Sequence, residues 1–211
     1  MADNNRNNGV LWLIIYVLFA LFPLVFMFMG ARPERDAWRQ LSLFLGFAGI
    51  GLMAIHFPMT AHIAAGDPPF ERPAVYRTHH QLAYVTTAFW LGHILILVVR
   101  HEWARRLLNV FTASWHARWA TIGTVALLVL MVLSIWRGSF GLKRVAWRNI
   151  HSALSVIALV LAMVHAYMVG NFLGTALERT LWILYGVITL LMIVYLRVYR
   201  PYFRSLEARR A

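Results

Sequence analysis

Residues 79–100 read HHQLAYVTTAFWLGHILILVVR, and this stretch decides the fold. It carries no acidic or basic residue from Gln81 to Val99. A helix of about 20 residues is long enough to cross the hydrocarbon core of a bilayer. Backbone polar groups find no water there, so a run of this kind has to be helical. The stretch therefore predicts a membrane-spanning helix with histidines at its start and in its interior.

Five further charge-free runs of similar length lie on either side of this stretch, and short connections hold most of the Arg, Pro, Asp and Glu residues. This layout predicts an all-α fold, an integral membrane six-helix bundle that forms a single domain over residues 1–211. The second run contains Pro58, where we expect an interruption. The expected spans are residues 10–29, 41–63, 81–99, 119–136, 150–168 and 180–196.

The composition agrees with a membrane protein. Hydrophobic residues make up 61% of the chain, whereas soluble domains hold about 45–50%. The net charge is +12, but the basic residues flank the apolar runs, so membrane topology explains them better than a nucleic-acid partner. More Lys and Arg residues fall on the side of the two termini, which predicts cytoplasmic termini. The first run is too long for a cleavable signal and is expected to be the first span.

Four of the nine histidines share one spacing. His79 and His93 lie 14 residues apart, and so do His151 and His165. Fourteen residues turn a helix to within about 40° of four full turns and rise about 21 Å, so each pair shares a helix face near opposite membrane surfaces. His80 is about 140° out of phase with His93, which makes His79 the better candidate without excluding His80.

Both histidine-bearing helices run in the same direction under this topology. His79 and His151 then lie at the inner level, and His93 and His165 lie at the outer level. Each pair could clamp the iron of one haem b from both sides, which leaves no open position and suits electron transfer. The chain has no cysteine, so two haem b groups would be held non-covalently. Arg77, Arg148 and Arg100 stand at the ends of these helices, where haem propionates would emerge.

The motifs HHQLA at 79–83, GH at 92–93, WRNIH at 147–151 and VH at 164–165 resemble the ferric reductase-like transmembrane domain superfamily. This superfamily includes ferric reductases, NADPH oxidases and the haem subunit of the bacterial periplasmic methionine sulfoxide reductase system. The resemblance covers about residues 40–202 in layout. It implies six helices, histidine pairs on the third and fifth, b-type haems, and electron flow from a cytoplasmic reductant to the outer side. We accordingly expect an oxidoreductase membrane subunit, in a bacterial inner membrane.

The chain departs from ferric reductases and NADPH oxidases after the sixth span. Those proteins continue into a flavin- and nicotinamide-binding domain, whereas this sequence stops at Ala211 and holds no Gly-rich dinucleotide fingerprint. Either a cytoplasmic flavin reductase carrying FAD or a quinol supplies the electrons, or the sequence is a piece of a longer protein. The acceptor could be a ferric chelate, oxygen or an outer-side redox protein.

Two alternatives stay open at this point. One is a quinol-linked, cytochrome b561-like subunit, and the other is a haem-free metal transporter or assembly factor. All carboxylates fall outside the spans, which argues against a proton pump. The remaining histidines, which include His56, His62, His101 and His116, are interpreted as polar groups near helix ends or in loops. His62 could also reach the inner haem or a quinone, and His101 and His116 with Glu102 could bind a metal ion or an electron acceptor.

Overall fold

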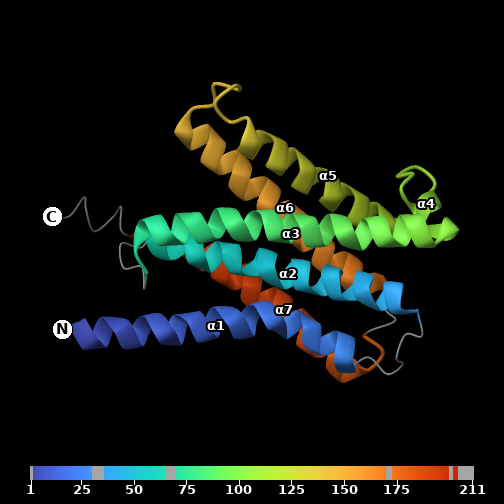
Figure 1. Ribbon diagram of the computed structural model, residues 1–211, viewed down its shortest axis with the longest axis horizontal. Helices are drawn as coiled ribbons and strands as arrows, with labels where there is room; N and C mark the ends of the chain where they lie inside the picture. Colours follow the sequence, from blue (N-terminus) through green and yellow to red (C-terminus); the bar gives the residue numbers. More distant parts are fainter. Residues whose placement is uncertain (1, 30–35, 65–69, 170–172, 200–201, 204–211) are drawn as a thin grey trace.

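The computed structural model describes residues 2–29, 36–64, 70–169, 173–199 and 202–203 of the chain (Figure 1). Within these ranges the chain is helical and forms no strand. The helices are α1 (Ala2–Met29), α2 (Ala37–Ala64), α3 (Arg72–Arg100), α4 (Glu102–Leu107), α5 (Trp115–Ile135), α6 (Arg144–Val169), α7 (Ala176–Val194) and the π-helix η1 (Tyr195–Tyr199).

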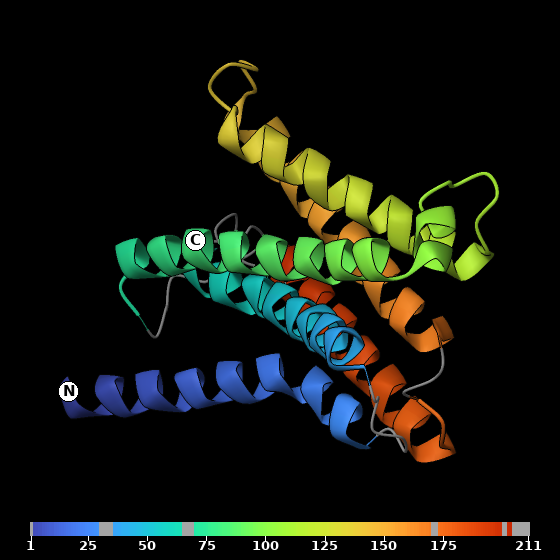
Figure 2. The ribbon, with the colours of Figure 1, turned by 45° about the vertical axis from the view of Figure 1, so that its right-hand side comes forward.

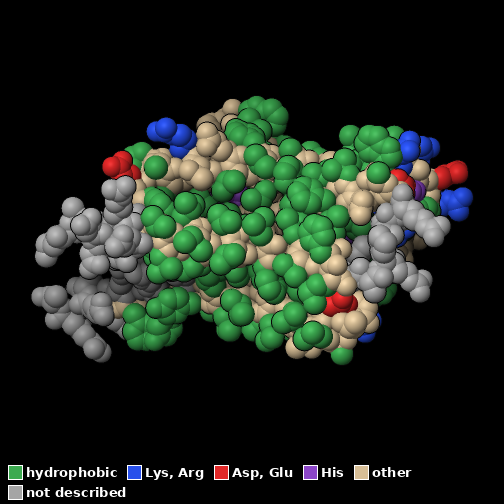
Figure 3. Space-filling model, turned by 60° about the horizontal axis from the view of Figure 1, so that its bottom comes forward, with side chains coloured by type: hydrophobic (Ala, Val, Ile, Leu, Met, Phe, Trp, Pro, Cys, Tyr) green, Lys and Arg blue, Asp and Glu red, His purple; other side chains and the backbone are tan. Residues whose placement is uncertain are grey.

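Six of these helices, α1, α2, α3, α5, α6 and α7, are long and apolar enough to cross a membrane. Apolar side chains cover the middle of the face shown in Figure 3, while the Lys, Arg, Asp and Glu side chains gather towards its two ends. A lipid-facing surface needs this distribution, because charged groups avoid the hydrocarbon core. The predicted all-α six-helix membrane bundle is confirmed, and the chain is an integral multi-pass membrane protein.

The helices extend beyond the apolar runs that predict them. α3 begins at Arg72 and α6 at Arg144, several residues before the expected spans. Arginine is a good helix former, so the helices continue into the headgroup region. α2 also continues through Pro58, where an interruption was expected. The short helix α4 follows α3 directly and was not predicted.

The bundle is organised around α2, which packs closely on α1 and α3, while α5 packs on α6 (Figures 1 and 2). A Cβ atom added at Gly51 of α2 would overlap the backbone carbonyl oxygen of Ala20 in α1. Small residues of this kind let membrane helices approach closely, as the glycines of the second run suggest. Trp182 of α7 packs edge-on against Phe26 and donates its indole N–H to the carbonyl oxygen of Met163, 3.1 Å away.

α3 and α6 run in the same direction, as both ribbon views show (Figures 1 and 2). α3 packs chiefly on α2, and α6 packs chiefly on α5. The two histidine-bearing helices therefore meet mainly through side chains rather than through close backbone contact. At the end near α4, this arrangement leaves a cavity that both helices line.

Candidate functional site

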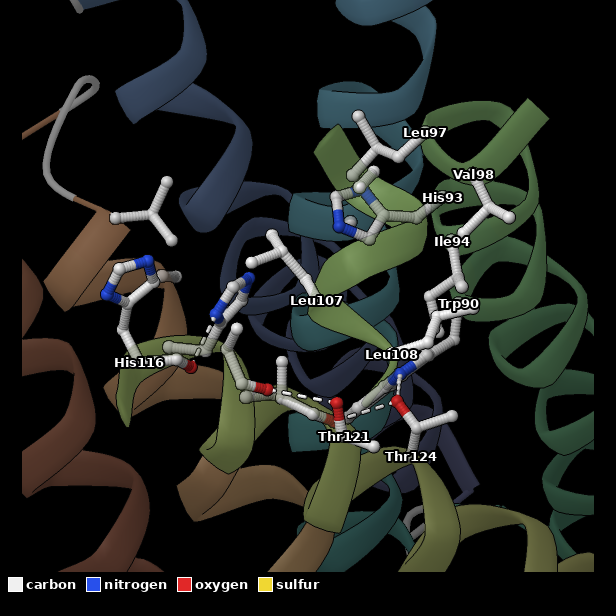
Figure 4. A pocket seen from close by; sticks show the side chains of 18 of the residues that line it. Trp90, His93, Ile94, Leu97, Val98, Leu107, Leu108, His116, Thr121 and Thr124 are labelled. Carbon is white, nitrogen blue, oxygen red and sulfur yellow. Dashed lines mark hydrogen bonds between the residues drawn. The ribbon is translucent and has the colours of Figure 1, made fainter. Parts of the chain in front are cut away.

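At the α4 end, a cavity of about 290 Å³ lies among α2, α3, α4, α5 and α6. His93 from α3 and His165 from α6 both line it, and Figure 4 shows the surrounding side chains. The rest of the wall is largely aliphatic and aromatic, with Arg39 and His116 among its few polar side chains. Cofactor sites are typically apolar cavities with a few placed polar groups. The late histidines of the two helices thus share one cavity, as their spacing predicts.

His93 is fixed by Ser42 of α2. Its Nδ1 lies 2.8 Å from the carbonyl oxygen of Ser42 and 3.0 Å from the Ser42 hydroxyl, which itself donates to the carbonyl oxygen of His93 at 3.0 Å. A carbonyl oxygen can only accept, so the Nδ1 of His93 carries the proton. A Cβ atom at Gly46 would stand 3.0 Å from that nitrogen, so the glycine leaves room for the ring. The Nε2 lone pair of His93 is consequently free for a ligand.

His165 is held in the same way by another backbone carbonyl. Its Nδ1 donates to the carbonyl oxygen of His116 at the start of α5, 3.1 Å away. The Nε2 of neither His165 nor His93 has a hydrogen-bond partner within the described residues. Metal-ligating histidines almost always donate their other ring N–H to a carbonyl or carboxylate, which fixes the tautomer. Both residues of the outer pair meet this requirement.

At the η1 end, His79 of α3 and His151 of α6 face each other with ring centroids 6.1 Å apart and ring planes at 59°. Two imidazoles bound to opposite sides of one metal ion, with metal–nitrogen bonds of about 2 Å, place their ring centroids roughly 6 Å apart. His80 is exposed, and its ring centroid lies 5.9 Å from that of His79. The structure therefore brings His79, rather than His80, opposite His151.

A third histidine, His56 of α2, joins this inner group. Its Nδ1 lies 2.9 Å from the Nδ1 of His79, and its Nε2 lies 3.4 Å from the hydroxyl of Thr86. If the Nε2–H of His56 donates to Thr86, then the Nδ1 of His56 accepts a hydrogen bond from the Nδ1–H of His79. Only this proton arrangement leaves the Nε2 of His79 with a free lone pair. The interpretation of His56 as a mere helix polar group missed this contact.

The predicted arginines lie at the helix ends but differ in their surroundings. Arg77 and Arg148 are exposed near the η1 end. Arg100 is exposed, and its guanidinium stacks over the ring of Trp38, 5.4 Å from the ring centroid. Two arginines that the sequence did not single out lie closer to the histidines. Arg39 lines the outer cavity, and Arg197 acts electrostatically on His79 and His151.

No protein-family model, curated protein or solved structure matches this chain. The resemblance to the ferric reductase-like superfamily thus stays a prediction. What the chain does has to be inferred from the placement of its histidines, because a helical bundle by itself does not specify a function. The side chain of His62 lies outside the described residues.

Proposed function

We propose that this protein is a ferric reductase-like haem b subunit that transfers electrons across a membrane. His79 and His151 would hold the inner haem, and His93 and His165 the outer one. The observation that supports this most directly is the backbone-bonded Nδ1 of both outer histidines. It leaves two ligand-ready Nε2 atoms on a shared apolar cavity between helices that run in the same direction.

The residues present fit haem in three respects. Four imidazoles occur as two pairs, separated along each helix by about 21 Å. The outer pair lines a cavity, and the inner pair has the ring separation of a bis-imidazole site. The buried Nδ1 of His151 and Nε of Arg197 lack hydrogen-bond partners in the described chain, and buried polar atoms rarely stay unpaired in a loaded protein. Bound haem would supply one-electron chemistry, and the chain would supply ligation, burial and orientation.

The direction of transfer follows from the proposed orientation. α1 begins and α7 ends at the same end of the bundle (Figure 1). The charge bias favours a cytoplasmic position for that end, and the membrane we propose is a bacterial inner membrane. Electrons would enter at His79 and His151 from a cytoplasmic flavin reductase or a quinol. They would leave from the level of His93 and His165 to a ferric chelate, oxygen or an outer-side redox protein.

A visible spectrum tests this function directly. We expect the purified full chain, expressed with ample haem, to give sharp low-spin b-type bands in a reduced-minus-oxidised spectrum, with about two haems per chain. Low-spin bands follow because imidazoles fill both axial positions of each iron. The ratio of haem to protein is measured by the pyridine haemochrome assay. A haem-free preparation under these conditions would overturn the proposal and leave a haem-free transporter or assembly factor as the alternative.

Replacing His56 tests the hydrogen bond behind the inner pair. His56→Ala removes the acceptor for the Nδ1–H of His79, which lowers the basicity of that imidazole and weakens its bond to ferric iron. We expect the inner haem to bind about 10–100-fold more weakly and its midpoint potential to rise. His56→Gln, whose amide oxygen can accept the same hydrogen bond, should restore much of both properties. Haem titration and potentiometry measure them, and an unchanged inner haem in His56→Ala would exclude this role.

A further inference from the structure

Arg197 occupies an unusual position for a cation. α7 ends at Val194 and continues as the π-helix η1, and Arg197 lies in the middle of that turn. π-Helical turns are rare and are frequent at functional sites. One terminal nitrogen of Arg197 donates to the hydroxyl of Thr60 in α2, 2.6 Å away. The side chain is therefore directed into the bundle and fixed against α2.

The charged group that acts on Arg197 among the described residues, Arg148, is positive. The Nε of Arg197 is buried and has no hydrogen-bond partner in the part of the chain that the structure describes. Burial, and then the nearby charge of Arg148, lower the pKa of the Arg197 guanidinium. His79 and His151 lie within its electrostatic reach. Within the described residues no carboxylate forms an ion pair with it.

A second donor at the same site also lacks a partner. The Nδ1 of His151 is buried and has no hydrogen bond to any described residue, and it would carry a proton whenever the Nε2 of that ring binds a metal. Buried donors and an unpaired buried guanidinium each carry a large desolvation penalty. A hydrogen-bond acceptor would offset both penalties. An oxyanion would offset that of the guanidinium most, because the planar guanidinium can bind it with two hydrogen bonds.

We propose that Arg197, assisted by Arg148, binds a carboxylate of the inner haem, one of its propionates. This inference rests on the proposed function, since it requires a haem between His79 and His151. The same chemistry could come from the phosphate of a lipid headgroup. The propionate is favoured because Arg197 is directed inward, beside the two imidazoles that would hold the iron, rather than towards the surrounding lipid.

The test compares two kinds of change on the full chain in vesicles of zwitterionic lipid, without and with added anionic phospholipid. The protein is expressed in haem-deficient cells and loaded with haem b or with haem dimethyl ester, whose propionates carry no charge. Haem affinity and midpoint potential are measured for wild type and Arg197→Gln. The inner haem is identified as the component that is lost in His151→Ala. Arg72→Gln, which removes an exposed charge from the same end of the bundle, is the matched control.

We expect either change alone to weaken binding of the inner haem by about tenfold or more. Arg197→Gln removes a cation near the iron and should lower the midpoint potential, whereas the ester removes a propionate anion and should raise it. Arg197→Gln loaded with the ester should bind the inner haem about as weakly as either single change does, since both changes remove the same interaction. Arg72→Gln should behave as wild type. Arg197→Lys keeps the charge but cannot form two parallel hydrogen bonds, so its affinity for the inner haem should lie between those of wild type and Arg197→Gln. If Arg197→Gln fails to fold, the ester with wild type still gives a result.

Two outcomes contradict the inference in different ways. An inner haem that binds normally as the ester, and whose potential instead follows the content of anionic lipid in the vesicles, would assign Arg197 to a lipid phosphate. If the losses of haem affinity caused by the ester and by Arg197→Gln simply add, then Arg197 and the propionate do not contact each other. Either result overturns the inference and leaves the haem function intact. A wild-type chain that takes up no haem overturns both.

Discussion

His93→Ala or His165→Ala is expected to remove the outer haem and to leave the inner one, so that each purified variant holds about one haem per chain. The chain has no cysteine, so haem would be held only by its histidine ligands and by packing. Loss of a residue that hydrogen-bonds a metal ligand weakens metal binding by about 10–100-fold, and loss of a ligand itself should exceed that. The same substitution at His79 or His151 should remove the inner haem.

The haem-to-protein ratio and the reduced-minus-oxidised spectrum measure this effect. His101→Ala is a suitable control, because His101 is at the same end of the bundle, stacks on Trp103 and does not line the cavity. It should retain full haem. Added imidazole, which can replace a missing ligand, should partly restore the low-spin spectrum of His93→Ala. Full haem loading in all four ligand variants would refute the assignment of these histidines.

The spans could be predicted from the sequence because two simple constraints act on them. A membrane helix needs about 20 apolar residues, and its backbone has to satisfy its own hydrogen bonds. Both constraints are local, so the apolar runs locate all six helices. The helix ends are less well predicted, because α3 and α6 continue through arginines that hydropathy counts as loop. α4 lies in a polar connection, where neither constraint applies.

The facing of the four histidines could also be predicted, since helical phase places residues 14 apart on one side. The contacts behind them could not. His56 was interpreted as a polar group near a helix end, whereas its partner His79 lies on α3, 23 residues away. The carbonyl oxygens of Ser42 and His116 belong to other helices. Every residue has a backbone carbonyl, so the sequence does not indicate which of them accepts these hydrogen bonds. Arg197 was counted only among the basic residues on the side of the termini, and the sequence does not show its hydrogen bond to Thr60 of α2.

Gly51→Ala and Gly49→Ala are expected to change stability in opposite directions, although they lie two residues apart on α2. In a helix interior, alanine is favoured over glycine by roughly 0.5–1 kcal/mol. At Gly49 the added methyl group would meet its nearest neighbours at 3.8 Å, which is ordinary contact. Gly49→Ala should therefore be neutral or slightly stabilising.

At Gly51 the same methyl group would overlap the carbonyl oxygen of Ala20. That oxygen belongs to the backbone of α1 and cannot rotate away, so α1 has to move off α2. Overpacking of this kind costs about 1–3 kcal/mol or more, which outweighs the gain in helix propensity. Thermal unfolding in detergent should show a lower midpoint for Gly51→Ala and an equal or higher one for Gly49→Ala. Shifts of the same sign in both variants would contradict this packing of α1 on α2.

The visible spectrum of the Gly51→Ala variant is expected to stay unchanged. α1 contacts the rest of the bundle chiefly through α2, whereas α2 is also held by its extensive packing on α3. The clash should therefore displace α1 and leave α2 in place. Ser42 and His56 would then keep their hydrogen bonds to His93 and His79. Gly51→Ala should lower thermal stability while the folded fraction keeps its haem bands, which separates a packing defect from the loss of a ligand.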